Sequence, residues 1–292
     1  MSVFLLRCLD VRRLQGAFAE AGGAVTTEEV ESAAVAAAVA LVLKLSEARF
    51  TPLFMTALEW SRARAEGSAR PLAFFRLVSA LATALRSVFV PFFRHLLSDC
   101  VAYLEEQPGD NARPKKKSRA AAGSVGTLAR ITFRLRTEIV RSLGACFLHD
   151  AVGFLDETRF NKLMRPLVLQ VSLEAPADAS AEEVADMDAA LVDCIFQMAQ
   201  NVRQDSLWRP LNRSVLLATR SEQTRPRRLG LAVVARLVES LAEEYLVLLP
   251  ETLPFLSELM EDADEVVEAS ARKLVTSLSA LAEEDVAELL AA

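Results

Sequence analysis

Glycine is scarce in this chain, with 10 residues in 292, and histidine, tryptophan and tyrosine number two each. Because β and α/β folds depend on many glycine-rich turns, this shortage argues against both, while 52% hydrophobic residues supply ample material for helical cores. The few glycines also form none of the phosphate-binding loops of nucleotide-binding proteins. The composition therefore predicts a protein that is almost entirely α-helical.

Histidine and cysteine are too few and too scattered to suggest catalysis or a metal site. His95 and His149 belong to no HxxxH, HxE or paired Cys/His arrangement, and each is expected to be a helix-surface or core residue. The cysteines form no CxxC motif; they are Cys8, Cys100, Cys146 and Cys194. We expect reduced, buried thiols of a cytosolic or nuclear protein. We expect no enzyme activity, no cofactor and no metal.

Long uncharged runs are also missing. The least charged stretch, residues 32–43, is well short of the roughly 20 residues that a membrane-spanning helix requires. Its alanine and valine content predicts instead a helix packed on all sides. Residues 1–10 carry Arg7 within their apolar part and are followed by no small-residue cleavage pattern, so we expect no secretion signal and an intracellular protein.

Apolar residues recur at helical spacing along almost the whole chain. Helices are predicted near residues 2–20, 27–49, 52–66, 71–106, 125–149, 157–173, 181–203, 206–219, 226–243, 245–261 and 264–281. Thr51 before Pro52 has the pattern of a helix start, and Ser180 with Glu183 that of a capping box. Pro91 should divide the run 71–106 into two helices, because proline removes a backbone donor and clashes with the preceding turn.

The end of the chain contains a repeated pattern. Residues 237–241 (LVESL) match residues 274–278 (LVTSL), and Ala232 matches Ala269, all at a shift of 37 residues. Helical repeats of roughly 35 to 47 residues are typical of HEAT-type solenoids, whose units bury a continuous core only by stacking. The sequence therefore predicts an all-α fold, an α-solenoid of HEAT-like helix pairs. The last two helices, joined by the acidic turn 261–265, should pack antiparallel.

Charge is unevenly distributed around a net charge of −6. Residues 241–292 hold 13 acidic and 2 basic residues, so this end should repel nucleic acid and bind a basic protein partner. Arginines gather on two predicted helices as candidate contacts for RNA or an acidic partner: Arg130, Arg134, Arg141, Arg225, Arg227 and Arg228. Their pairing with acidic neighbours on adjacent helices remains the favoured alternative, because no aromatic residues interleave with them to stack bases.

A polar segment, residues 105–126, is rich in proline, glycine and lysine and is expected to be a flexible loop. Its basic run is a candidate nuclear-localisation signal or RNA-phosphate contact: Arg113, Lys115, Lys116, Lys117 and Arg119. A simple solvated loop is the open alternative. The expected organisation is a helical region over residues 1–106, a flexible basic loop over 107–124 and HEAT-like repeats over 125–292.

Several stretches carry a family resemblance. They are residues 205–220 with Trp208, Pro210 and Leu211, residues 244–262 with Pro250 and Pro254, and residues 49–60, which end in Trp60 and are followed by the run 74–97. These stretches resemble the C-terminal end of the HEAT-repeat U3 small nucleolar RNA-associated proteins, the large HEAT-repeat subunit of the small-subunit processome. The resemblance covers most of the chain from about residue 45 to 280.

What this resemblance implies is a non-catalytic scaffold of the nucleus and nucleolus. Family members join the early pre-ribosomal particle with processome proteins, the U3 small nucleolar RNA and the ribosomal RNA precursor as partners. They support processing of small-subunit ribosomal RNA and transcription of ribosomal DNA by RNA polymerase I, and they use no membrane and no small-molecule substrate. Because family members are far longer, this chain is expected to correspond to their C-terminal end. A HEAT-repeat scaffold of another kind, a nuclear-transport or phosphatase adaptor, is the open alternative.

Overall fold

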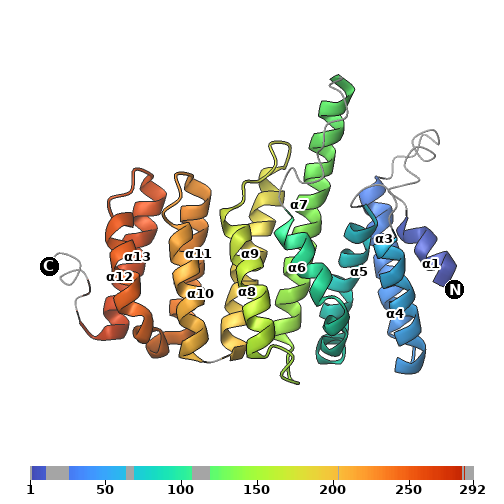
Figure 1. Cartoon of the computed structure of the whole chain (residues 1–292), viewed down its shortest axis with the longest axis horizontal. Helices are drawn as coiled ribbons and strands as arrows, with labels where there is room; N and C mark the ends of the chain where they lie inside the picture. Colours follow the sequence, from blue (N-terminus) through green and yellow to red (C-terminus); the bar gives the residue numbers. More distant parts are fainter. Residues whose placement is uncertain are drawn as a thin grey trace. The chain divides into compact units, whose positions relative to one another are not determined.

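The computed structural model describes residues 2–10, 26–63, 69–106, 119–202, 204–284 and 286. Within these residues every regular element is a helix (Figure 1). The chain forms two compact units. Unit 1 comprises Met1–His95, Gln107–His149 and Ala175–Glu183, and unit 2 comprises Leu96–Glu106, Asp150–Glu174 and Val184–Ala292. The predicted all-α class is confirmed.

Unit 1 is organised around one central helix. Its elements are α1 (Ser2–Leu9), α3 (Thr27–Val42), α4 (Glu47–Arg62), α5 (Ala69–Leu85), the 3-10 turns η2 (Arg86–Val88) and η3 (Val90–His95), and α7 (Arg119–Leu148). Helix α5 packs against α3, α4 and α7. Four phenylalanine rings close the core beside it, with centroids 5.0 to 6.2 Å apart: Phe50, Phe54, Phe89 and Phe92. Aromatic pairs at such distances stabilise a core beyond the area that they bury.

The same central helix is the one described helix that is both long and apolar enough to pass as a candidate membrane span. The stretch Ala69–Val88 has a mean hydropathy of 1.3 over its best window and is long enough to cross a membrane by length and composition alone. Half of that window is buried inside unit 1. A core helix that is covered on several sides has this composition as well.

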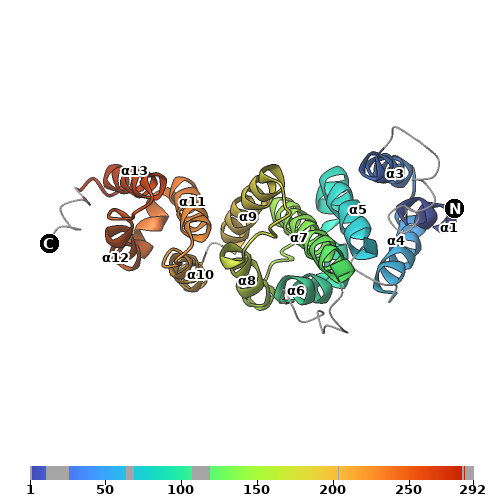
Figure 2. The same cartoon turned by 90° about the horizontal axis from the view of Figure 1, so that it is seen from above.

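Unit 2 stacks helix pairs one after another. Its elements are α6 (Leu97–Glu105), α8 (Glu157–Ser172), α9 (Ala181–Val202, whose first turn belongs to unit 1), α10 (Asp205–Ala218), α11 (Thr224–Leu241), the 3-10 helix η4 (Ala242–Leu248), α12 (Leu249–Leu259) and α13 (Glu265–Ala282). Helices α8, α10 and α12 form one layer and α9, α11 and α13 the other (Figure 2). Helix α10 contacts α8, α11 and α12, and α11 contacts α13. This serial stacking is the α-solenoid arrangement that the sequence predicts.

The 37-residue repeat has the same burial pattern in both copies. Leu237, Val238 and Leu241 of α11 are buried, and so are Leu274, Val275 and Leu278 of α13. The matched alanines, 232 and 269, are both exposed. Equivalent sequence positions therefore occupy equivalent structural positions, with the Leu and Val side chains inward and the alanine outward.

Two predicted helix boundaries are confirmed and one is wrong. The segment around Pro91 interrupts the helix as η2 and η3, and Ser180 caps α9 through a 3.2 Å bond from the Glu183 backbone N–H. The run 27–49 is not one helix, because α3 ends at Val42 and α4 begins at Glu47, so Pro52 lies inside α4. The earlier start lets Phe50 and Phe54, one turn apart, both reach the aromatic core.

Two further expectations are corrected. Helix α7 begins at Arg119, inside the segment 107–124 that was expected to be a loop, because Ala120–122 favour helix strongly. Residues 32–43 do not pack on all sides. Helix α3 buries one stripe of residues, and its alanines 33, 36, 37 and 40 are exposed. Alanine side chains are short and expose little apolar area, so a second helix covering them would gain little.

The close contact between α10 and α11 gives a prediction at Gly230. A Cβ atom at this position would lie 2.7 Å from Cγ2 of the buried Thr219. Glycine to alanine inside a helix normally stabilises by about 1 kcal/mol. Here overpacking by about 1–3 kcal/mol should outweigh that gain, so Gly230→Ala should unfold at lower urea concentration than the wild type.

The matched control removes the methyl group of Thr219 that a Cβ atom at residue 230 would meet. In the double variant Gly230→Ala with Thr219→Ser, the Cγ2 methyl is absent and the helix-propensity gain should reappear. Equal destabilisation by the single and the double variant would show that the contact with Thr219 is not what limits residue 230.

Candidate functional site

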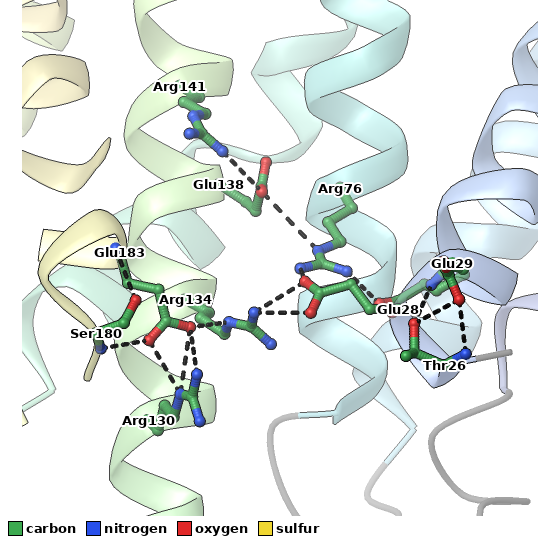
Figure 3. A network of polar contacts seen from close by, with 11 residues as sticks. Thr26, Glu28, Glu29, Arg76, Arg130, Arg134, Glu138, Arg141, Ser180 and Glu183 are labelled. Atoms are coloured by element: carbon green, nitrogen blue, oxygen red, sulfur yellow. Dashed lines mark hydrogen bonds and ion pairs between the residues drawn. The ribbon is translucent and has the colours of Figure 1, made fainter. Parts of the chain in front are cut away.

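Arginines and glutamates form a connected network in unit 1 (Figure 3). Its members come from α3, α5, α7 and the first turn of α9, and they include three of the arginines that the sequence singled out. The four cations are Arg76, Arg130, Arg134 and Arg141, and the four carboxylates are Glu28, Glu31, Glu138 and Glu183. The network is therefore balanced in charge.

Arg76 on α5 is the inner part of the network. Its Nη2 donates to Oε1 of Glu28 at 2.8 Å, and its Nη1 pairs with Glu31, whose side chain is completely buried. Its Nε lies 3.9 Å from Oε1 of Glu138 on α7. Arg76 was not singled out by sequence. The only signal would have been an arginine within a long, largely apolar helix, since a charge that is buried there must find partners.

The arginines of α7 extend the network outward. Arg134 donates through Nη2 to both oxygens of Glu28, at 2.8 and 3.0 Å, and its Nε lies 2.6 Å from Oε1 of Glu183. Arg130 donates to the same Glu183 at 3.0 to 3.2 Å. Arg141 donates to Glu138 of its own helix at 3.2 Å. Arg130 and Arg134 thus pair with acidic residues of other helices, as the alternative interpretation expected, and Arg141 pairs within its own helix. Contact with RNA stays a prediction.

The network shifts the pKa of its carboxyl groups in opposite directions. Partial burial alone would raise the pKa of Glu28, but hydrogen bonds from Arg76 and Arg134 overcome this effect and hold the pKa at about 2. Burial raises the pKa of Glu138, and the nearby charges of Arg141 and Arg76 offset this only in part. Glu28 is therefore fixed as an anion between two helices.

Arg225 in the first turn of α11 connects three helices of unit 2. Its Nη1 donates to the carbonyl oxygen of Leu173, just after α8, at 2.5 Å, and its Nη2 donates to Oδ1 of Asp188 on α9, also at 2.5 Å. Burial raises the pKa of Asp188, against the lowering effect of Arg225. Arg225 therefore holds α11 against the preceding helix pair.

Arg227 and Arg228 connect α11 to the following pair. Arg227 donates to the Ser221 carbonyl oxygen at 3.0 Å and to Oδ1 of Asp262 at 3.0 Å. Arg228 donates to both carboxylate oxygens of Asp264, the N-cap of α13. The hydrogen bond from Arg228 lowers the pKa of Asp264, which also accepts backbone bonds at the helix start.

Together with two pairs that join α12 to α10 and to the turn just after α10, these contacts form a set that we call the inter-repeat ion pairs. They are Arg225–Asp188, Arg227–Asp262, Arg228–Asp264, Arg213–Glu251 and Arg220–Glu258. The partners are 35 to 38 residues apart in sequence, close to the repeat length. The arrangement can fix the spacing and register of successive helix pairs.

The residues that carry the family resemblance lie in helices α4, α10 and α12. Trp208 and Leu211 of α10 are buried, and the indole N–H of Trp208 donates to the Ala199 carbonyl oxygen at 3.0 Å. Pro210 and Pro254 lie inside α10 and α12, and Pro250 lies in the first turn of α12. Trp60 of α4 is half-buried, with the Arg70 guanidinium 5.3 Å from its ring centroid.

A buried polar group beside these residues was missed by sequence reasoning. The Tyr245 hydroxyl donates to Oδ1 of Asn212 at 2.9 Å and lies 3.0 Å from Oγ1 of Thr252. Asn212 in turn donates to Oγ1 of Thr252 at 3.2 Å. Burial raises the pKa of Tyr245 above its ordinary range. Because an unsatisfied buried polar group is costly, these three side chains specify how α10, η4 and α12 fit together.

The remaining predicted features are the basic run, the cysteines and the expected lack of a metal site. Residues 113 and 115–117 of the basic run lie outside the described residues, and Arg119 opens α7. Cys100, Cys146 and Cys194 are free and buried, and Cys8 is free and half-buried, largely as predicted. Within the described ranges, no three His, Cys, Asp or Glu side chains gather in a way that could hold a metal ion.

The stacked helix pairs place this protein among the HEAT-type helical repeat proteins. Residues 1–155 match the family model described as the BP28CT (NUC211) domain, which is more than half of the chain. The chain belongs to this family.

Curated relatives match almost the whole chain. An uncharacterised protein of Arabidopsis thaliana is 36% identical over 98% of it, and HEAT repeat-containing protein 1 of Homo sapiens is 32% identical over 95%. U3 small nucleolar RNA-associated protein 10 of Chaetomium globosum is 26% identical over 95%. The chain covers only 13%, 12% and 15% of these relatives, respectively.

The low pKa of Glu28 predicts a defined contribution to stability. A carboxyl group whose folded pKa lies below its unfolded value stabilises the fold when ionised. Its contribution is complete above about pH 4.5 and is lost as the pH falls from about 4.5 towards about 2. In a carboxyl-carbon NMR titration, Glu28 should still be ionised at the lowest pH at which the protein stays folded.

Arg134→Gln should raise the pKa of Glu28 towards 4.5, because one of its two guanidinium partners is lost. Arg49→Gln is the matched control, since Arg49 is exposed and makes no ion pair among the described residues. A wild-type Glu28 that titrates near 4.5 would contradict this account of the network.

Proposed function

We propose that this protein is a non-catalytic scaffold in the early assembly of the small ribosomal subunit, acting in the small-subunit processome of the nucleolus. The observation that carries the proposal is the match of nearly the whole chain to a relative whose name states association with the U3 small nucleolar RNA. Support for transcription of ribosomal DNA by RNA polymerase I is a finer part of the same proposal.

The construction of unit 2 supports a scaffold. Stacked helix pairs offer a long surface, and each inter-repeat ion pair holds its neighbours in a fixed register. A scaffold has to present several contact patches at set distances, which this register provides. The proposed partners are processome proteins, the U3 RNA and the ribosomal RNA precursor, with a basic protein at the acidic end, residues 241–292.

The direct test is a pull-down of the tagged chain from nuclear extract at moderate salt, with bound RNA sequenced and bound proteins identified. We expect U3 RNA, the ribosomal RNA precursor and processome proteins. Recovery of transport cargo or phosphatase subunits instead would leave the fold intact and favour the alternative adaptor function.

RNA contact through the arginines is a separate proposal. The side chains of Arg225 and Arg227 are 21% and 15% exposed, and that of Arg228 is 48% exposed. Arg228 is therefore the most accessible of the three. RNA phosphates would have to compete with the carboxylates that already bind these guanidinium groups. Arg130, Arg134 and Arg141 are the corresponding proposal in unit 1. The basic run at Arg113, Lys115, Lys116, Lys117 and Arg119 is proposed as a nuclear-localisation or RNA-binding element.

The triple variant of Arg225, Arg227 and Arg228 to alanine tests this proposal in a titration with single-stranded ribosomal RNA. It should bind more weakly and reduce the slope of log affinity against log salt by about 2, at roughly 0.7 for each lost phosphate contact. An unchanged affinity and slope would rule out these contacts.

A second triple variant separates RNA contact from loss of structure. Asp188→Asn, Asp262→Asn and Asp264→Asn keep the arginines and remove the competing charges, and asparagine can still cap α13. If the arginines contact RNA, this variant should bind RNA more tightly than the wild type.

A further inference from the structure

One edge of unit 1 combines exposed cations with exposed large apolar side chains. We call it the basic-apolar edge, and its members are Leu43, Lys44, Arg49, Arg86 and Val88. All five are exposed, and the exposed fractions of Leu43 and Val88 are 54% and 66%. Exposed apolar side chains of this size beside exposed cations are unusual on a water-facing surface and often mark an interaction site.

The fold brings these residues together from two separate segments. Leu43, Lys44 and Arg49 lie at and just after the turn from α3 to α4, and Arg86 and Val88 belong to η2 (Figure 1). The rings of Phe50 and Phe89, the residues that directly follow Arg49 and Val88, lie 6.2 Å apart. This ring contact therefore holds the start of α4, with Arg49, beside η2, and Leu43 and Lys44 belong to the turn that leads into α4.

The charges of this edge are not used in ion pairs within the part of the chain that the structure describes. Unit 1 pairs its other cations extensively, with Arg70 bound to Asp10 and Arg76 bound to Glu28, for example. Lys44, Arg49 and Arg86 make no ion pair with any described residue. The one exposed carboxylate in this stretch is Glu47, which leaves a local excess of positive charge.

Arg86 is also held in a strained backbone conformation. Its φ is +51°, in the left-handed region that residues other than glycine and asparagine seldom adopt. Asparagine or glycine would relieve this strain, whereas arginine retains it. Strained residues gather at functional sites, and here the conformation presents Arg86 and Val88 outward from the end of α5.

We propose that the basic-apolar edge binds an acidic peptide segment of a partner protein that also carries large apolar side chains. The three cations would face carboxylates, and Leu43 and Val88 would lie against apolar side chains of the segment. A peptide of this kind fits better than RNA, because the edge offers no exposed aromatic ring for base stacking and because phosphates gain nothing from Leu43 and Val88. This inference does not rest on the proposed role in ribosome assembly.

The test uses the full chain and a fluorescent peptide of about 16 residues with glutamates along one helical face and leucines at i, i+4 and i+7. Anisotropy should detect binding by the wild type. The variant Lys44→Glu, Arg49→Glu and Arg86→Asn should bind about tenfold or more weakly, since each exposed ion pair contributes modestly. Asparagine tolerates the left-handed backbone, so the variant should remain folded.

The matched control moves the charge change elsewhere. Lys162, Arg165 and Arg209 are exposed and make no ion pair with any described residue, so their replacement by glutamate alters net charge to a similar extent. This control should bind the peptide within about twofold of the wild type if the effect is local, because only long-range, salt-screened attraction changes.

Three outcomes would overturn the proposal. They are no binding of the peptide by the wild type, loss of binding in the control as severe as in the edge variant, and equal binding of a peptide with serine in place of leucine. A fourth measurement uses single-stranded RNA of about 20 nucleotides. Loss of RNA binding in the edge variant with unchanged peptide binding would assign the edge to RNA and contradict the peptide proposal.

Discussion

A single pair of helices cannot bury the apolar side chains of both its faces, and the rest of this structure depends on that constraint. Each pair in unit 2 must lie on its neighbour, so the contact surface between pairs has to be reproducible. Leucine and valine supply the driving force but specify position weakly, because many sliding arrangements bury similar areas. The inter-repeat ion pairs and the Asn212–Tyr245–Thr252 group restrict these alternatives, since a shift of one pair would leave buried or half-buried polar groups without partners.

Unit 1 meets the same constraint differently. Its helices surround α5, and the four-ring aromatic core supplies dense packing at one side. On the other side, polar contacts connect α3, α5 and α7 through Arg76 and Glu28. The buried Glu31 cannot remain charged in an apolar interior without a cation beside it, so Arg76 and Glu31 require each other. The network thus contributes specificity to the helix arrangement more than net stability.

Much of the fold could be predicted from the sequence because helix formation and repeat stacking leave periodic signals. The 37-residue match between residues 237–241 and 274–278, the capping pattern at Ser180 and the interruption at Pro91 are local features, and all three are present. Predictions were wrong at the starts of α4 and α7, although Ser46, the N-cap residue of α4, and the alanines 120–122 of α7 are local signals. The start of α4 at Glu47 also brings Phe50 to Phe89 and Phe92 from across the unit, a contact that no local pattern reveals.

The candidate sites were less predictable for the same reason. Sequence identified arginines on α7 and α11 as clustered charges, but it could not assign Glu183 to Arg130 or Asp264 to Arg228, which are 53 and 36 residues apart. Arg76 and the basic-apolar edge left no cluster in sequence at all. Charge composition gives the number of cations in a segment, while the fold alone determines which of them are neutralised.

The discontinuity of unit 1 affects the order in which the chain can fold during synthesis. Its final segment, Ala175–Glu183, follows residues that belong to unit 2, and it carries the carboxylate shared by Arg130 and Arg134. A nascent chain that ends at residue 155, where the family match ends, holds both arginines but not their common partner. Completion of the first unit must therefore wait for the ribosome to translate part of the second, so the two units cannot mature strictly one after the other.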